Sequence, residues 1–353
     1  MNPLAGLAWS VARSNLGELP QPYRLTFALT DRCQARCTMC GIWQKPVDNE
    51  LTLAEIDAFF QHTNRFSWIN LTGGEIFQRP DISDIFRIVT TRCRHLYLLN
   101  FPTNGFQNDD IVKGVQLILK QSRPARLMVT VSMDGPPPLH DSIRGLPGLW
   151  ERAMDTYNRL RILQSPRFSV FLGYTLQRAN IHAFDETMRA CRGVVGDISA
   201  EDFHINVAHI SGHYYANQEY TGTLTASEAR QAINAILALR RRPLFAPVGI
   251  LERRYQKLAA AYLESGRSPL PCQAANASCF ITPDGDVFAC TGQASLVGSL
   301  RESGMDLRQL WQSPERLKTR HDIRSGSCPG CWTPCEAYQT ILGNLLPIRR
   351  SRP

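Results

Sequence analysis

The chain of 353 residues has no long run of apolar side chains. A transmembrane helix needs about 20 consecutive, mainly apolar residues, and no stretch approaches that length, so we expect no membrane-spanning segment. The N-terminus, MNPLAGLAWSVARSNLGEL, also lacks the basic residues and the apolar stretch of a signal peptide. Its apolar residues recur at helical spacing, which favours a short docking helix over the alternative of a membrane-surface contact. The sequence therefore predicts a cytoplasmic protein.

Basic side chains exceed acidic ones, but they lack the pattern of a nucleic-acid-binding protein. The formal net charge is +8, and basic clusters occur at 240–242, 253–254 and 348–352. No aromatic residues are interleaved with these clusters, so we interpret them as solvated helix faces and a basic tail. The 18 residues after Cys335 are too few for an RNA-binding appendage, and no nucleic-acid partner is expected.

A fourth cysteine is missing from the first of two cysteine clusters. Cys33, Cys37 and Cys40 lie within eight positions, whereas tetrahedral metal sites and iron–sulfur clusters usually have four protein ligands. One coordination position is therefore left open. Six of the eleven cysteines lie in the last quarter of the chain: Cys272, Cys279, Cys290, Cys328, Cys331 and Cys335. The two others, Cys93 and Cys191, stand alone and are interpreted as core residues.

Short apolar strands alternate with amphipathic helices over residues 23–210. Strands are expected at 23–30, 66–72, 95–100, 126–134, 168–176 and 202–210, and helices at 52–63, 82–93, 109–121, 148–163 and 181–192. This alternation is typical of βαβ units around a parallel sheet. Right-handed crossovers then allow either an open doubly wound sheet or a barrel. Six units favour an α/β fold with a partial (β/α)6, TIM-like barrel.

The chemically suggestive residues follow directly after predicted strands. Cys33, Cys37 and Cys40 come after the first strand, the sequence GGE at 73–75 after the second, TNG at 103–105 after the third and DGP at 134–136 after the fourth. The C-terminal ends of parallel strands form the active face of such sheets. We therefore expect these motifs to converge on one site.

Together these motifs resemble the radical S-adenosylmethionine (radical SAM) superfamily. The resemblance rests on Cys33-x3-Cys37-x2-Cys40, on GGE at 73–75 and on SMDGPPPLHDSIRG at 132–145. It implies that the three thiolates bind three irons of a [4Fe-4S] cluster, and that S-adenosylmethionine occupies the open position. An electron from a donor such as flavodoxin or ferredoxin then cleaves the cofactor, and the resulting 5′-deoxyadenosyl radical abstracts a hydrogen atom from the substrate.

The resemblance also implies roles for residues around the cofactor. Gly73 and Gly74 match the pair whose backbone meets the methionyl amino group, because side-chain-free residues allow a close approach. Glu75 would help to fix that group, and Met39 lies where the family has an apolar residue near the adenine.

Two further positions match family residues that hold the carboxylate of the cofactor, Ser132 and Arg144, since a guanidinium suits a carboxylate. A structural salt bridge is the alternative for Arg144. Asp134 and Asn104 either line the site or form turns.

The C-terminal cysteines resemble the SPASM extension of this superfamily or its shorter twitch form. Cys272-x12-Gly285-x4-Cys290 is followed by Cys328-x2-Cys331, and the Asp-Gly pair in TPDGDVFAC predicts a hairpin. The resemblance implies one or two auxiliary [4Fe-4S] clusters. Two fully protein-bound clusters would need eight ligands, but this region has only six cysteines. We therefore expect one cluster bound by Cys272, Cys279, Cys290 and one of Cys328, Cys331 or Cys335, with a structural zinc site as the alternative.

The sequence divides into an N-terminal segment and four further regions. These are residues 1–22, a radical SAM partial barrel at 23–222, a helical bridge at 223–268, an auxiliary-cluster domain at 269–340 and a basic tail at 341–353. In the bridge, one helix is expected to begin at Thr225 or Ser227 and another to end at Gly266. Substrate contacts or proton transfer, or else plain packing, are expected from His204, His209, His213, Tyr214 and Tyr215.

These observations predict a radical SAM oxidoreductase or modifying enzyme whose substrate is a small molecule, a sugar or lipid precursor, or a peptide. About 22 residues precede the first strand, which leaves no room for a leader-binding domain. A peptide maturase would therefore need a separate leader-binding partner. The alternative from a different class is a non-enzymatic protein that binds zinc through its nine clustered cysteines.

Overall fold

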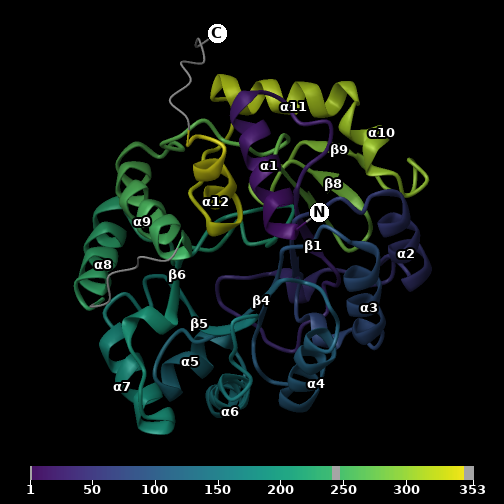
Figure 1. The fold of residues 1–353 in the computed structure, drawn as a ribbon. Helices are drawn as coiled ribbons and strands as arrows, with labels where there is room; N and C mark the ends of the chain where they lie inside the picture. The colour runs from purple at the N-terminus through teal and green to yellow at the C-terminus, as the bar shows by residue number, and fades with distance from the viewer. Residues whose placement is uncertain (1, 241–246, 346–353) are drawn as a thin grey trace.

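The structure is a computed structural model that describes residues 2–240 and 247–345. Within them, the strands form one sheet in the order β6-β5-β4-β3-β2-β1-β7-β8-β9 (Figure 1). The strands are β1 Arg24–Ala28, β2 Trp68–Thr72, β3 Leu98–Thr103, β4 Arg126–Ser132, β5 Phe168–Leu176, β6 Phe203–Val207, β7 Ser278–Ile281, β8 Asp286–Phe288 and β9 Leu296–Ser299. The helices are α1 Pro3–Leu16, α2 Leu53–His62, α3 Ile82–Arg92, α4 Asn108–Leu119, α5 Pro137–Arg144, α6 Leu149–Arg161, α7 Phe184–Val195, α8 Ala226–Ala238, α9 Pro247–Ser265, α10 Leu307–Trp311, α11 Pro314–Ser325 and α12 Pro334–Leu342.

The first six strands are parallel, and each pairs with the next in sequence. Helices α2, α3, α4, α6, α7 and α8 form an arc around the outside of these strands (Figure 1). Among the described residues β6 pairs only with β5 and lies at the edge of the sheet, so these strands do not form a closed barrel. The predicted partial (β/α)6 barrel is therefore confirmed. The Thr52–Glu55 capping box begins α2, and a second capping box at Thr225 begins α8.

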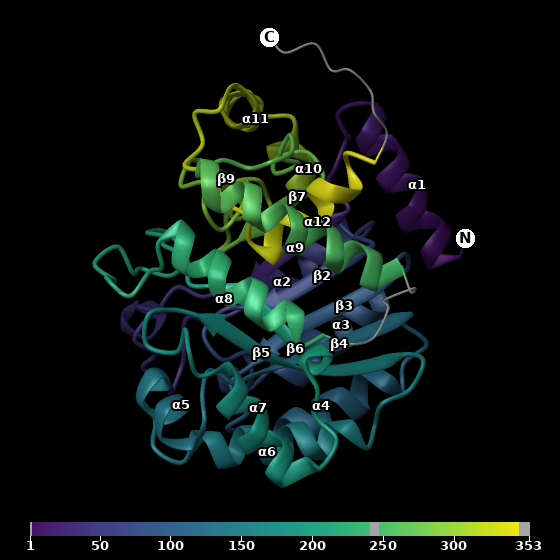
Figure 2. The same cartoon turned by 90° about the vertical axis from the view of Figure 1, so that its left-hand side faces the viewer.

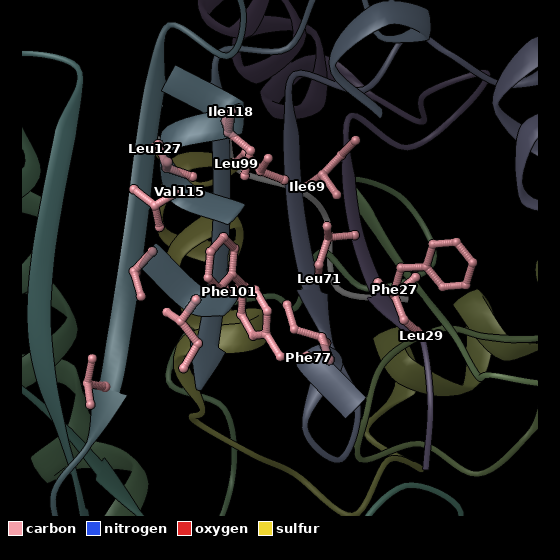
Figure 3. Packing of buried hydrophobic residues seen from close by; sticks show 14 of the residues in the cluster. Phe27, Leu29, Ile69, Leu71, Phe77, Leu99, Phe101, Val115, Ile118 and Leu127 are labelled. Carbon is pink, nitrogen blue, oxygen red and sulfur yellow. The ribbon is translucent and has the colours of Figure 1, made fainter. Parts of the chain in front are cut away.

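Alternating side chains of each strand separate a hydrophobic core from the concave face of the sheet. The core lies between the strands and the outer helices, and residues such as Phe27, Leu71 and Phe101 are fully buried there (Figure 3). The residues between them on each strand point to the concave face, where polar side chains such as Asn100 and Thr130 are half-buried. Burial of the apolar layer fixes the register of the strands, because a shift by one residue would exchange the two faces.

The C-terminal region continues the barrel sheet. Strand β7 pairs in parallel with β1, with Cys279 opposite Leu25, and the predicted hairpin joins β7 to the antiparallel β8. Gly285 closes the turn at φ +93°, a conformation that favours glycine. The elements α10, α11 and α12 gather with α1 on one side of the barrel (Figures 1 and 2).

The expected N-terminal helix is present as α1, and it docks on α12. Asn15 Nδ2 donates a 2.8 Å hydrogen bond to the carbonyl oxygen of Leu342, and its Oδ1 accepts one from the Leu345 amide. No helix among the described residues is long and apolar enough to cross a membrane. The basic residues at 241–242 and the tail from 346 onward, which includes the cluster at 348–352, lie outside the described residues.

Candidate functional site

The loop that carries Cys33, Cys37 and Cys40 follows β1 and is fixed by backbone contacts with a segment far along the chain. The Arg36 amide donates to the carbonyl oxygen of Arg144 at 2.9 Å, and the Thr38 amide donates to that of Ile143 at 2.8 Å. Both carbonyls belong to the last turn of α5, a helix that was not predicted. The C-terminus of α5 therefore holds the first half of the cysteine loop.

The second half of the loop is held by the segment after β6. The Gly41 amide donates to the carbonyl oxygen of Tyr215 at 2.7 Å, and Asn217 Nδ2 donates to that of Met39 at 2.8 Å. Asn217 Nδ2 also donates to the carbonyl oxygen of His209. Sequence reasoning missed Asn217, although its position after the sixth strand was a signal that it lies on this face.

The three thiols of the loop influence one another. Burial raises the pKa of Cys33 to about 12, with smaller increases from Glu75, Cys37 and Cys40. Burial likewise raises the pKa of Cys40 to about 11 and that of Cys37 above its usual value. Iron would have to displace the thiol protons, as metals do when they bind cysteine. The structure thus brings the predicted triplet together in a desolvated loop whose thiols interact.

The glycine pair lies against the backbone of the same loop. The Gly74 amide donates to the carbonyl oxygen of Thr30 at 2.7 Å. A Cβ on Gly74 would lie 2.2 Å from the carbonyl oxygen of Arg32, and one on Gly73, which has φ +138°, would lie 2.2 Å from that of Thr30. Close packing on the cysteine loop therefore explains why both positions need glycine.

Glu75 is buried and is fixed to the end of β3. Its Oε2 accepts hydrogen bonds from Thr103 Oγ1 at 3.0 Å and from the Asn104 amide at 2.7 Å. Burial raises the pKa of this carboxyl to about 7. Asn104 both forms a turn, by accepting from the Phe106 amide, and reaches the cysteine loop, by accepting from Gln34 Nε2 at 3.2 Å.

Arg144 forms an ion pair with Asp134, which is the alternative that the sequence left open. Its Nη2 lies 2.6 Å from Oδ2 of Asp134, whose side chain is fully buried. Nη1 of Arg144 also donates to Sγ of Cys37 at 3.8 Å. The Asp134 Oδ1 accepts from the Thr175 amide at 2.8 Å. Ser132 ends β4 on the concave face and is half-buried.

Met39 contacts residues that follow β5. Gln177 Nε2 donates to Sδ of Met39 at 3.9 Å, and Gln177 Oε1 accepts from Thr38 Oγ1 at 3.4 Å and from the Tyr220 hydroxyl. Gln177 is almost fully buried. Sequence reasoning missed Gln177, although it follows the fifth strand directly, as the other site residues follow theirs.

The residues predicted around β6 are divided between several environments. Tyr214 is buried, and its hydroxyl lies 2.8 Å from Thr72 Oγ1. His204 stacks on Phe171 at 4.1 Å on the concave face. His213 Nε2 lies 3.0 Å from the carbonyl oxygen of Cys290. The segment thus contacts both the cysteine loop and the C-terminal cysteines.

Four of the six C-terminal cysteines gather. Cys272 and Cys328 pack against one small cluster that contains Cys290. The pKa of Cys290 is raised by burial, then by Glu336, Cys331 and Cys272, and that of Cys331 by burial, then by Cys272, Glu336 and Cys328. The Ala274 amide donates to Sγ of Cys272 at 3.4 Å, and the Gln293 amide donates to Sγ of Cys290 at 3.3 Å. Amide hydrogen bonds to cysteine sulfur are a common feature of iron–sulfur sites.

The other two C-terminal cysteines lie elsewhere. Cys279 is fully buried in the main hydrophobic core, on the face of β7 that points to the outer helices. Cys335 lies in the first turn of α12, where its pKa responds mainly to burial and also to Arg24 and Glu336. The sequence analysis expected Cys279 to lie beside Cys272 and Cys290, but the structure keeps Cys279 apart from them.

Comparisons with known proteins identify the two parts of the chain. The model of the radical SAM superfamily matches residues 27–191, and that of the SPASM iron–sulfur cluster-binding domain matches residues 272–336. The AdoMet-dependent heme synthase of Methanosarcina barkeri is 23% identical over 331 residues, which cover 88% of each chain. Pre-heme d1 synthase of Dinoroseobacter shibae is 25% identical over 94% of this chain and 82% of that protein.

A third relative matches over a shorter length. The subtilosin biosynthesis protein AlbA of Bacillus subtilis is 25% identical over 56% of this chain, but only over 42% of AlbA. Two solved structures share the fold. Streptococcus suis SuiB bound to S-adenosylmethionine has a TM-score of 0.60 at 14% identity, over 88% of this chain and 70% of SuiB. The protein anSMEcpe with bound AdoMet has a TM-score of 0.56 at 15% identity, over 84% and 83%. The chain belongs to the radical SAM superfamily and carries a C-terminal SPASM iron–sulfur cluster-binding domain.

Proposed function

We propose that this protein is a radical SAM enzyme that binds three irons of a [4Fe-4S] cluster through Cys33, Cys37 and Cys40. The observation that carries the proposal is that these three interacting thiols lie on one loop, which α5 and the segment after β6 hold from both sides. With the cluster and S-adenosylmethionine bound, one electron from the donor would be used to cleave the cofactor into methionine and a 5′-deoxyadenosyl radical, which would take a hydrogen atom from the substrate. Flavodoxin or ferredoxin is the proposed electron donor.

The residues around the loop then orient the cofactor and limit access of water. Gln177 positions Met39 beside the proposed adenine site, because it joins Met39 to Tyr220. Gly73, Gly74 and Glu75 place the end of β2 next to the loop, where the methionyl amino group would bind.

Ser132 is the proposed contact of the cofactor carboxylate. We assign Arg144 to positioning Cys37, since its guanidinium is already paired with Asp134. Arg144 therefore acts through a cysteine instead of gripping the carboxylate directly.

For the auxiliary site we propose one [4Fe-4S] cluster bound by Cys272, Cys290, Cys328 and Cys331. Their grouping and the amide hydrogen bonds to Cys272 and Cys290 support this ligand set. Cys279 is left out because its side chain lies in the hydrophobic core. Cys335 is left out because no other cysteine is among the causes of its pKa shift.

A structural zinc site is the alternative for these cysteines. Tetrahedral zinc with Zn–S bonds of about 2.3 Å needs thiolates roughly 4 Å apart. A cubane separates its ligands more widely.

The relatives that match along most of their length are named as heme synthases, which favours a small-molecule substrate over a peptide. The match to AlbA supports peptide maturation as a second candidate.

The test is anaerobic incubation of the reconstituted protein with S-adenosylmethionine and dithionite. The wild type should form 5′-deoxyadenosine, and variants with alanine at Cys33, Cys37 or Cys40 should form none. Formation of the product by these variants would contradict the proposal.

A further inference from the structure

A cavity of about 460 Å³ lies between α8 and α9, beside the free edge of β6. These two helices are neighbours in both views of the fold (Figures 1 and 2). Ile205 and Val207 of β6 form one wall, Ile236 of α8 the second, and Ala259 of α9 the third. The volume is within the usual range of small-ligand sites.

The cavity also reaches the C-terminal cysteines. Its lining includes Gly292, two residues after Cys290, and Pro329 and Gly330, which lie between Cys328 and Cys331. A ligand in this cavity would therefore contact the loops that carry the proposed auxiliary cluster.

His209 connects the cavity to the first cysteine loop. Its imidazole lines the cavity, while Asn217 joins its carbonyl oxygen to that of Met39. The cavity thus lies beside a segment that touches both cysteine sites.

The walls of the cavity are mainly apolar and carry almost no charge. Among its described lining residues there is no Asp, Glu, Lys or Arg. The side-chain polar atoms of two of its aromatic residues are already paired: Trp332 Nε1 donates to the carbonyl oxygen of Tyr255, and the Tyr255 hydroxyl donates to that of Trp332. Gln256 is similarly engaged, since its Nε2 donates to Glu252. Burying an unpaired charge in such surroundings is strongly unfavourable.

Two polar groups are available to orient a ligand, the imidazole of His209 and the buried hydroxyl of Thr333, which has no hydrogen-bond partner. Burial lowers the pKa of His209, so that its imidazole is mainly neutral at pH 7 and offers one N–H donor and one nitrogen acceptor. A hydroxyl or carbonyl group at this end of the ligand would be a suitable partner.

We propose that this cavity binds an uncharged, largely hydrocarbon portion of the substrate, with a hydroxyl or carbonyl group at His209. The inference rests on the proposed function, because it assigns a substrate class to that enzyme. It predicts that a substrate rich in carboxylates does not place them here.

The test uses a matched pair of probes, decan-1-ol and decanoate, which share a chain length and differ in charge. Each displaces the uncharged dye Nile red from the anaerobically reconstituted protein, and dye fluorescence is recorded. Decan-1-ol should displace the dye at a concentration at least tenfold lower than decanoate. Equal or better displacement by decanoate would overturn the inference.

Substitutions locate the binding. Ala259→Trp fills the cavity and should weaken dye binding at least tenfold, whereas Ala261→Trp, on the exposed side of the same helix, should leave it unchanged. If Ala259→Trp does not fold, Ile233→Trp on α8 provides the same test from the opposite wall. Unchanged dye binding in a folded cavity variant would place the dye elsewhere and contradict the proposal.

The same measurement on the variant with alanine at Cys33, Cys37 and Cys40 separates the two claims. The cavity should bind the dye even when that variant forms no 5′-deoxyadenosine. If the wild-type protein binds the dye but forms no 5′-deoxyadenosine, the result would contradict the proposed function and not the assignment of the cavity.

Discussion

The Arg144 guanidinium lies 2.6 Å from the Asp134 carboxylate and donates to Sγ of Cys37 at 3.8 Å. One arginine at the end of α5 thus connects the end of β4 to the cysteine loop. Its pair with Asp134 is buried, so a partner left alone would be an uncompensated charge.

Replacing Arg144 with lysine should therefore destabilise the cysteine loop, and any effect on cofactor binding should follow from that change. Lysine keeps the charge but loses the planar group that reaches Asp134 and Cys37 together. We expect a loss of roughly 1–3 kcal/mol in the free energy of unfolding, from hydrogen bonds to charged groups. Urea denaturation measures it, with Arg87→Lys in the exposed Asp84 pair as the control. Unchanged stability together with weaker S-adenosylmethionine binding would contradict this assignment and show that Arg144 binds the cofactor carboxylate.

Gly74→Ala tests the packing of the second strand on the cysteine loop. Its new Cβ would lie 2.2 Å from the carbonyl oxygen of Arg32, so the loop must move. We expect the variant to lose the iron of the first site and to retain that of the C-terminal site. Gly193→Ala in α7 meets nothing within 4 Å and should stabilise the helix by about 0.5–1 kcal/mol. Full iron content in Gly74→Ala would show that the loop tolerates a side chain there.

The lowered pKa of His140 should make the free energy of unfolding depend on pH. The residue is buried on α5, where its Nδ1 accepts from the Asp134 amide, and burial lowers its pKa to about 3. In the unfolded chain it would bind a proton below about pH 6.5. The unfolded state then binds more protons, so stability falls as the pH falls below that value.

Between pH 7.5 and 5.5 this histidine should cost roughly 1.4 kcal/mol of stability. His140→Asn retains an acceptor at the same place and should remove that part of the pH dependence, as measured by urea denaturation at both pH values. His321→Asn, on the exposed surface of α11, serves as the control. An identical pH dependence in wild type and His140→Asn would show that His140 does not control it.

Cys272 and Cys279 lie seven residues apart but should behave differently. Cys272→Ala should remove about four of the roughly eight irons expected for two cubanes. Cys279→Ala should keep them all, because its thiol lies in the hydrophobic core. Iron analysis after anaerobic reconstitution distinguishes the two variants. Equal losses would restore Cys279 to the ligand set and contradict the grouping seen in the structure.

Local patterns were sufficient to predict much of the fold. Alternating strands and helices predicted the parallel sheet, and the pair Asp284-Gly285 predicted the β7–β8 hairpin. The helix α5 was not predicted, although it begins with Pro137 and Pro138, and proline is well tolerated in the first turn of a helix.

Features that depend on contacts between distant segments could not be predicted. The direction of the Cys279 side chain follows from the pairing of β7 with β1, where Cys279 lies opposite Leu25. The partner of Arg144 depends on how α5 packs against β4, and the sequence favoured the cofactor carboxylate over the salt bridge that the structure shows. Gln177 and Asn217 carry no motif, so their positions after β5 and β6 were the single local signal.

The most direct test of the central claim is the iron content and S-adenosylmethionine cleavage of the variant with alanine at Cys33, Cys37 and Cys40 together. The account predicts no 5′-deoxyadenosine, about half of the wild-type iron, and a remaining iron–sulfur cluster visible by paramagnetic resonance. Cofactor cleavage by this variant would contradict the assignment of the first site. A variant with no iron, or with zinc in its place, would contradict the auxiliary cluster at Cys272, Cys290, Cys328 and Cys331.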